Sequence, residues 1–213
     1  MSKLTSRIAT GVLWLAALCL LPGGALWMAS PLGIFLANAR LTQGSDMFWM
    51  LFPSAPLLLA AGVVGLWALG SLGGGWLTRI SAVAALAGLA LVIAGCVGLF
   101  WLSLDETYTI AAPAYRTFRV GLIVLAAGAM LVGIAGVRAR ALPLWGALPF
   151  VVAALCGLAA FLWELGTLGS GLWAVFGAGW VWLGFSVAAS KAAALLGKRW
   201  SLFRSGKADA DSA

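Results

Sequence analysis

Long runs of apolar residues alternate with short polar connections along this chain of 213 residues. A helix needs about 20 apolar residues to cross the roughly 30 Å hydrocarbon core of a bilayer, and unpaired backbone groups cannot face lipid, so each run predicts a transmembrane helix. The runs are apolar on every face, whereas a membrane strand alternates apolar and polar residues. We predict an all-α integral membrane protein with six transmembrane helices in one bundle, near residues 9–29, 51–71, 80–103, 120–137, 142–163 and 171–190.

The composition fits a membrane protein and excludes several kinds of chemistry. Hydrophobic residues make up 63% of the chain and charged residues 9%, whereas a soluble domain has about 25% charged residues. The absence of histidine excludes histidine-ligated haem, histidine-bearing zinc sites and imidazole catalysis. All three cysteines fall in apolar runs, where we expect them to pack as small apolar residues. We predict no cofactor and no metal, with a bound lipid or hydrophobic ligand left open.

The positive charges predict the orientation of the bundle. With a cytoplasmic N-terminus, ten basic residues lie inside and three, Arg40, Arg116 and Arg119, lie outside. This bias follows the positive-inside rule, and an even number of spans returns the C-terminus to the cytoplasm. The net charge of +7 then faces anionic inner-leaflet lipids, so it requires no nucleic-acid partner. We expect a location in a cell membrane, most simply the cytoplasmic (inner) membrane of a bacterium.

The chain divides into a transmembrane domain, 1–190, and a basic cytoplasmic tail, 191–213. Each basic residue near an anionic leaflet contributes about 1 kcal/mol, so several together predict contact of the tail with inner-leaflet lipid. The alternative is a docking site for a cytoplasmic partner. The residues expected to make the lipid contact are Lys198, Arg199, Arg204 and Lys207.

The first span and the connection after it are less regular than the rest. The small residues Gly23, Gly24 and Ala25 resemble a signal-peptide cleavage site, which is the alternative to an uncleaved first span.

Ser30 is a candidate helix cap and Pro31 a candidate first residue of a short helix. Apolar residues follow at helical spacing, so we expect an interfacial helix flat on the outer leaflet. A gating or docking element is the alternative.

Glycines recur at intervals of seven residues in three predicted spans. Lipid tails remove the hydrophobic drive for helix association, so membrane helices rely on small residues that let their backbones approach closely. We therefore expect these glycines to lie at helix contacts of a compact bundle. They are Gly88 and Gly95, Gly121 and Gly128, and Gly177 and Gly184.

Two predicted hairpins resemble each other in sequence. The segment 59–62 recurs at 125–128, and the segment 84–90 recurs at 153–159 with one difference. A turn that differs in length by three residues reconciles the two offsets, which makes spans two and three a parallel duplicate of spans four and five. Chance recurrence in a chain rich in Ala, Leu and Gly is the alternative.

The chain contains 12 tryptophans, and most are expected at the membrane interfaces. Trp180 and Trp182 instead fall near the middle of the last span, where each indole N–H must find a partner or remain unsatisfied. Trp173, Phe176 and Trp180 share one helical face, and Trp182 lies on another. These four residues are a candidate aromatic wall for a hydrophobic ligand, a pigment or a partner helix. Ordinary core or lipid-facing packing is the alternative. The expected outer-boundary tryptophans are Trp27, Trp49, Trp101, Trp163 and Trp173, and the inner-boundary ones are Trp76, Trp145 and Trp200.

Polar chemistry is expected only at the outer rim. No acid, base or amide falls deep in a predicted span, so the sequence does not indicate a proton or ion pathway. Glu164 follows the fifth span on the side where Arg116 and Arg119 precede the fourth. We expect interfacial anchoring there, with an ion pair in a polar outer mouth as the alternative. The candidate outer-mouth cluster comprises Glu164, Arg116, Arg119, Asp105, Glu106, Tyr108 and Tyr115.

These patterns predict a non-catalytic accessory or scaffold subunit of a larger membrane complex, with membrane lipids and other membrane subunits as its partners. Packing glycines and aromatic residues are abundant, and neither paired intramembrane acids nor a Ser–His or Cys–His arrangement is available for catalysis. The alternative is a transporter of a small solute or lipid, or its substrate-binding membrane subunit. A pocket lined by Trp180 or Glu164 would favour that alternative. An enzyme that acts on lipids ranks third.

Overall fold

The computed structural model describes residues 3–38, 51–68, 70, 75–102, 109–163 and 166–210, and within this part of the chain the regular structure is entirely helical. The predicted all-α fold is therefore confirmed. The helices are α1 (Lys3–Asn38), α3 (Ser54–Ala68), α4 (Trp76–Val97), the π-helix η1 (Gly98–Leu102), α5 (Ala111–Arg138), α6 (Leu144–Trp163) and α7 (Gly166–Ala210).

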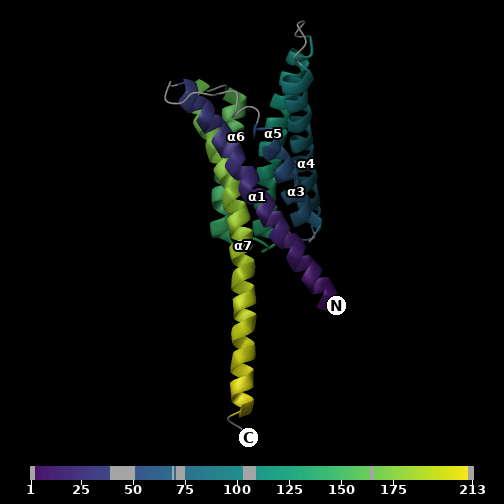
Figure 1. The fold of residues 1–213 in the computed structure, drawn as a ribbon, viewed down its shortest axis with the longest axis vertical. Helices are drawn as coiled ribbons and strands as arrows, with labels where there is room; N and C mark the ends of the chain where they lie inside the picture. Colours follow the sequence, from purple (N-terminus) through teal and green to yellow (C-terminus); the bar gives the residue numbers. More distant parts are fainter. Residues whose placement is uncertain are drawn as a thin grey trace.

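The α-helices close into a ring of packed neighbours. Each α-helix contacts the one that follows it in the chain, and α1 contacts α7, so the first and last helices complete the bundle. Figure 1 shows α1 running obliquely across α7, with both chain termini beyond the same end of the bundle. The even number of crossings and the assignment of this end to the cytoplasm stay predictions.

Five segments are long and apolar enough to cross a bilayer, as expected of a membrane-embedded protein: Gly11–Gly33, Trp76–Val97, Ala111–Arg138, Leu144–Trp163 and Leu168–Ser190. The predicted span at 51–71 contains α3, which has only 15 residues. At 1.5 Å per residue α3 is about 22 Å long, less than the roughly 30 Å of a hydrocarbon core. Six full-length spans are therefore not confirmed.

Proline and glycine explain the shortness of α3. Pro53 lies in the turn before the helix, and Pro56 occupies its first turn, where a missing N–H removes no helical hydrogen bond. At the other end Gly70 has a φ of 61°, and its N–H donates to the Trp67 carbonyl at 2.9 Å. Glycine adopts this left-handed conformation without steric cost, so the helix stops although the sequence around it is apolar.

Helix α1 differs from the prediction at its second half. It continues through Pro22 and Pro31 to Asn38, so no separate interfacial helix begins at Ser30. The Ser30 hydroxyl donates to the Leu26 carbonyl at 3.1 Å, inside the helix, and does not cap a new one. Neighbouring helices stabilise a proline-containing membrane helix by packing against it. The rest of the predicted interfacial segment, 39–50, lies outside the described residues.

Helices α5 and α7 are longer than predicted. Helix α5 begins at Ala111, so Tyr115, Arg116 and Arg119 are part of its first turns and do not precede it. Helix α7 continues past the predicted end of its span to Ala210. In Figure 1 this last part of α7 extends alone, well away from the other helices.

The predicted glycine contacts are confirmed, and the closest join α4 to α5. A Cβ added to Gly121 would lie 2.6 Å from the Val92 nitrogen, and one added to Gly128 would lie 2.5 Å from the Ala85 nitrogen. Such distances leave no room for a side chain, so the helix backbones meet directly. Gly177 makes the corresponding contact between α7 and α1, with Met28.

The two similar hairpins also pack in a similar way. Gly62 of α3 and Gly128 of α5 each face the preceding helix in the ring, where they meet Leu20 and Ala85 respectively. The glycines of α4 and α6, Gly88 and Gly157, each face the following helix. This arrangement supports the predicted duplication, which stays a prediction.

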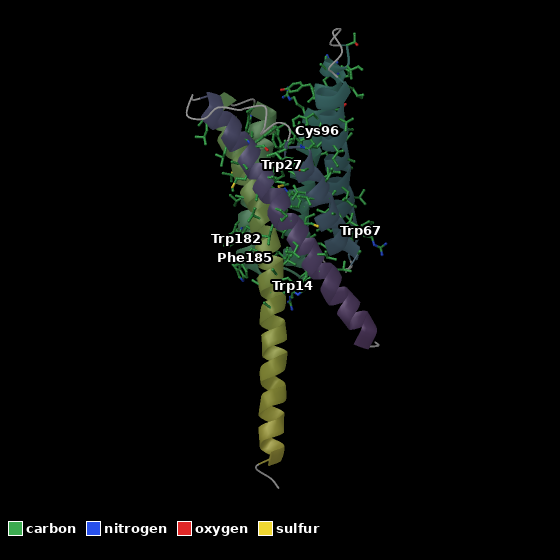
Figure 2. All side chains as sticks on the ribbon, viewed as in Figure 1. Trp14, Trp27, Trp67, Cys96, Trp182 and Phe185 are labelled. Carbon is green, nitrogen blue, oxygen red and sulfur yellow. The ribbon has the colours of Figure 1, made fainter. Side chains whose placement is uncertain are left out.

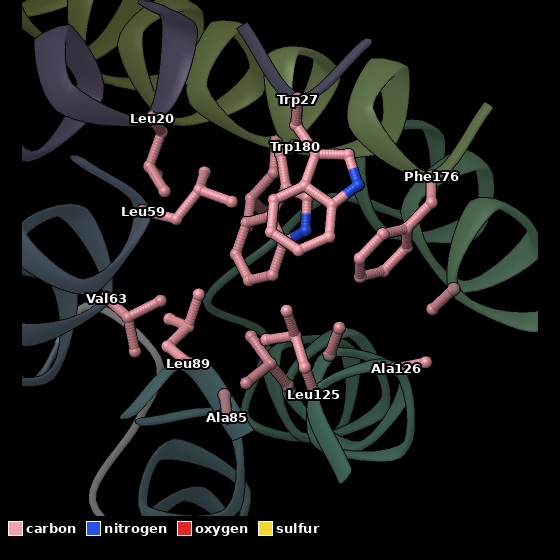
Figure 3. Packing of buried hydrophobic residues seen from close by; sticks show 14 of the residues in the cluster. Leu20, Trp27, Leu59, Val63, Ala85, Leu89, Leu125, Ala126, Phe176 and Trp180 are labelled. Carbon is pink, nitrogen blue, oxygen red and sulfur yellow. The ribbon is translucent and has the colours of Figure 1, made fainter. Parts of the chain in front are cut away.

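The centre of the ring is filled by large apolar side chains. Trp27 from α1 and Phe176 and Trp180 from α7 meet leucines of α3, α4 and α5, as Figure 3 shows. Trp27, Phe176 and Trp180 are each 0% exposed. The described interior is therefore a packed core.

Candidate functional site

The predicted aromatic wall forms part of an internal cluster of rings. Phe176 packs edge-on against Trp27 at 5.5 Å between ring centroids and against Trp180 at 6.1 Å. Trp173 stacks on Phe52 at 6.0 Å with an interplanar angle of 13°. Helix α7 thus contributes three of the four predicted residues to the core, where they pack against other aromatic side chains.

Trp182, the fourth predicted wall residue, faces away from this cluster. It is 39% exposed, and its Nε1–H donates to the Trp145 carbonyl at 3.0 Å. The two indoles pack edge-on at 6.2 Å, and Figure 2 shows Trp182 and Phe185 well below Trp27. Trp180 and Trp182 are two positions apart on a helix and point in different directions, so the two predicted faces of α7 lie in different surroundings.

Two tryptophans expected at the outer boundary, Trp27 and Trp173, face the interior of the bundle and not its surface. Trp27 is buried in the centre of the bundle, and the partly buried Trp173 packs against the core. Gly24 explains the position of Trp27, because a Cβ there would lie 2.6 Å from the Val181 nitrogen, so α1 approaches α7 closely one turn before Trp27. Other boundary tryptophans fit better, since Trp76 and Trp163 are strongly exposed at helix ends.

Trp27 and Trp180 each have a buried Nε1 without a hydrogen-bond partner among the described residues. An unsatisfied buried donor costs about 1–3 kcal/mol. Both indoles are held edge-on to phenyl rings: Trp180 meets Phe150 at 4.9 Å and 73°, and Trp27 meets Phe52 at 5.0 Å and 60°. The positive edge of one ring against the face of another offsets part of this cost.

The predicted outer-mouth cluster is only partly described. Tyr115 and Arg116 are exposed on the first turns of α5. The Arg119 guanidinium reaches across to α6 and donates to the Phe161 carbonyl at 3.4 Å. This carbonyl belongs to the last turn of α6, where carbonyls lack helical partners and a cation is favourable. The contact supports anchoring of α5 to α6; Asp105, Glu106, Tyr108 and Glu164 lie outside the described residues.

The basic residues predicted to contact lipid lie on the projecting part of α7. At 1.5 Å per residue, Lys198 is about 12 Å beyond Ser190 and Lys207 about 25 Å beyond it along the helix axis. The headgroup layer adds only about 5–8 Å on each side of the hydrocarbon core. A straight α7 therefore carries Arg204 and Lys207 past the headgroups, and the predicted lipid contact stays a prediction.

The sequence analysis missed a cleft at the end of the bundle from which α7 projects. It has a volume of about 860 Å³ and lies between the α5–α6 turn and α7. Its signal in the sequence is weak, because Arg140 is one of several basic residues between apolar runs. The lining residues are Val137, Arg140, Ala141, Leu142, Pro143, Leu144, Trp145, Ala189 and Ser190.

The described residues contain no group of three or more potential metal ligands of the His, Cys, Asp or Glu type. Cys19, Cys96 and Cys156 are free thiols within helices, and Cys96 is buried in the core. Comparison with protein-family models, with curated proteins and with solved structures finds no match for this chain.

Proposed function

We propose that this chain is a non-catalytic scaffold subunit of a larger membrane complex, and that it docks its partner through the projecting part of α7. The observation that carries the proposal is the continuation of α7 as a helix for 20 residues beyond the apolar segment that ends at Ser190. Most helix stability in proteins comes from packing against a neighbour, and Figure 1 shows this part of α7 away from the other helices. A partner surface supplies that packing.

The sequence of the projection suits a protein partner. Leu196, Trp200 and Phe203 recur at a spacing that places them on one face of a helix. Lys198, Arg199, Arg204 and Lys207 supply positive charge on the same segment. The partner surface is therefore an apolar groove with acidic residues at its edge, the usual counterpart of a basic amphipathic helix.

The packed centre also supports a scaffold over the transporter alternative. That alternative depends on a pocket lined by Trp180, and Trp180 is 0% exposed between Phe150 and Phe176. Opening a path there requires separating edge-packed rings, each pair of which contributes about 0.5–1.5 kcal/mol beyond area burial. An occupied interior and a projecting helix are features of a structural subunit.

The test compares the full chain with a chain that ends at Ser190, each expressed in its native membrane, crosslinked there and recovered in mild detergent. We expect the full chain to retain a defined partner in stoichiometric amount and the shortened chain to lose it. Circular dichroism and gel filtration confirm that both bundles are folded. Recovery of the full chain as a lone monomer, or equal retention by the shortened chain, would overturn the proposal.

A matched pair of double variants separates docking through the apolar face from a general effect of positive charge. Replacement of Trp200 and Phe203 by Ser removes the apolar face of the projection, whereas replacement of Arg204 and Lys207 by Gln removes only charge. We expect the first pair to abolish retention of the partner and the second to weaken it with increasing salt. Retention that is unchanged in the first pair contradicts docking through this face.

A further inference from the structure

The cleft between the α5–α6 turn and α7 combines one cation with an apolar wall. Its lining is mainly apolar, with Leu144 and Trp145 strongly exposed and Arg140 at its edge. The Trp182 N–H donates to the Trp145 carbonyl at 3.0 Å and the two indoles pack edge-on at 6.2 Å, so this wall is preformed. A mixed cleft of this kind fits a ligand with an anionic end and an apolar body.

The backbone at Arg140 shows that the turn places an arginine where glycine is usual. The Arg140 N–H donates to the Val137 carbonyl and the Ala141 N–H to the Gly136 carbonyl, both at 2.9 Å. These are the two hydrogen bonds of a Schellman motif, which commonly has glycine in its left-handed position. Arg140 occupies that position with a φ of 53°, the only positive φ among the described residues that are not glycine.

A strained backbone conformation at a residue other than glycine motivates the hypothesis that its side chain has a function. The turn would be less strained with glycine, and the chain uses glycine at 28 other positions. Within the described part of the chain, the Arg140 guanidinium has no ion-pair partner. It is therefore available for a ligand at the edge of the cleft.

The cleft lies where the end of the α6 transmembrane segment, at Leu144, meets the end of the α7 segment, at Ser190. That is the level at which lipid headgroups meet the hydrocarbon core. A guanidinium binds phosphate oxygens through two parallel hydrogen bonds, and exposed tryptophan and leucine side chains pack against acyl chains. We infer that this cleft binds one anionic glycerophospholipid, with its phosphate on Arg140 and an acyl chain against Leu144 and Trp145.

The experiment uses native mass spectrometry of the full chain, delipidated in detergent and titrated with phosphatidylglycerol or with phosphatidylcholine of the same acyl chains. We expect one phosphatidylglycerol to be retained preferentially. Arg140→Gln and Arg140→Gly should each weaken its retention about ten-fold or more, because a charge-assisted hydrogen bond is lost. Arg138→Gln, at an exposed position on the same turn but outside the cleft, should leave it unchanged.

Two further measurements keep the inference falsifiable. Arg140→Gly should raise the melting temperature by about 2–4 °C while it weakens lipid retention, which separates loss of the ligand from loss of the fold. Trp145→Ala should weaken retention of both lipids, because it removes the acyl wall and keeps the backbone carbonyl that Trp182 needs. Equal loss in Arg138→Gln, unchanged retention in Arg140→Gly, or displacement of the lipid by inorganic phosphate alone would each overturn it.

Discussion

The α4–α5 and α1–α7 pairs both bring helix backbones together at glycines, yet they use this device differently. In the α4–α5 pair, Gly121 and Gly128 meet backbone atoms of different residues, Val92 and Ala85. In the α1–α7 pair, Gly24 and Gly177 meet each other, with a Cβ on one lying within 2.9 Å of the carbonyl oxygen of the other. The first pair is a seam of separate contacts, whereas the second has a crossing beside the buried indoles, at which two glycines meet each other.

The largest expected effect is in the α4–α5 seam. Gly128→Ala forces a Cβ to 2.5 Å from the Ala85 nitrogen, which is backbone and cannot move aside alone. We expect the free energy of unfolding to fall by about 1–3 kcal/mol, the usual effect of overpacking. Denaturation in mixed micelles measures it. Gly11→Ala is the matched control, because a Cβ there meets nothing within 4 Å. An equal loss of unfolding free energy in this control would contradict the role of the α4–α5 contact.

Double variants sharpen the contrast between seam and crossing. Gly24→Ala and Gly177→Ala obstruct one shared contact, so their combination should destabilise less than the sum of the two, by about 0.5 kcal/mol or more. Gly121→Ala and Gly128→Ala lie about 10 Å apart on α5 and meet different neighbours, so their effects should add. Unfolding of the wild type and all six variants under identical conditions checks both statements. Additivity at the crossing would show that the two glycines act separately.

The smallest expected effects distinguish the two tryptophans near the middle of α7. Trp182→Phe removes a hydrogen bond to the Trp145 carbonyl and should lower the free energy of unfolding by about 0.5–1.5 kcal/mol. Trp180→Phe removes a donor that has no partner among the described residues, which offsets the lost ring volume. We therefore expect Trp180→Phe to destabilise less than Trp182→Phe. Thermal melting in detergent gives the order, and the reverse order would contradict this account of the unpaired indole.

The sequence predicted the features of the fold that depend on composition and on the spacing of residues. Continuous apolar runs identified the helices, and glycine spacing identified contacts such as Gly121 with Val92. The predicted helix bounds were wrong where local backbone conformation or packing set the end of a helix. A single glycine with positive φ ends α3 early, and neighbouring helices stabilise α1 through Pro22 and Pro31, although proline usually marks a boundary.

The aromatic and charged residues were harder to place. The interfacial preference of tryptophan does not predict the full burial of Trp27, which follows from the close approach of α1 and α7 at Gly24. The cleft beside Arg140 depends on the turn and on a helix about 50 residues later in the chain, so no local pattern indicates it. Burial and contacts between residues far apart in the chain arise only when the ring of helices assembles, so local sequence patterns do not predict them.

Helix α7 is one unbroken element of 45 residues, about 68 Å from end to end. Its first half carries Trp173, Phe176 and Trp180 into the aromatic cluster, and its second half stands free of the bundle. Such a rod acts as a lever that pivots at the aromatic cluster. A tilt of a few degrees there moves the far end of the helix by several ångströms. A partner bound to that end is therefore mechanically coupled to the packing inside the membrane.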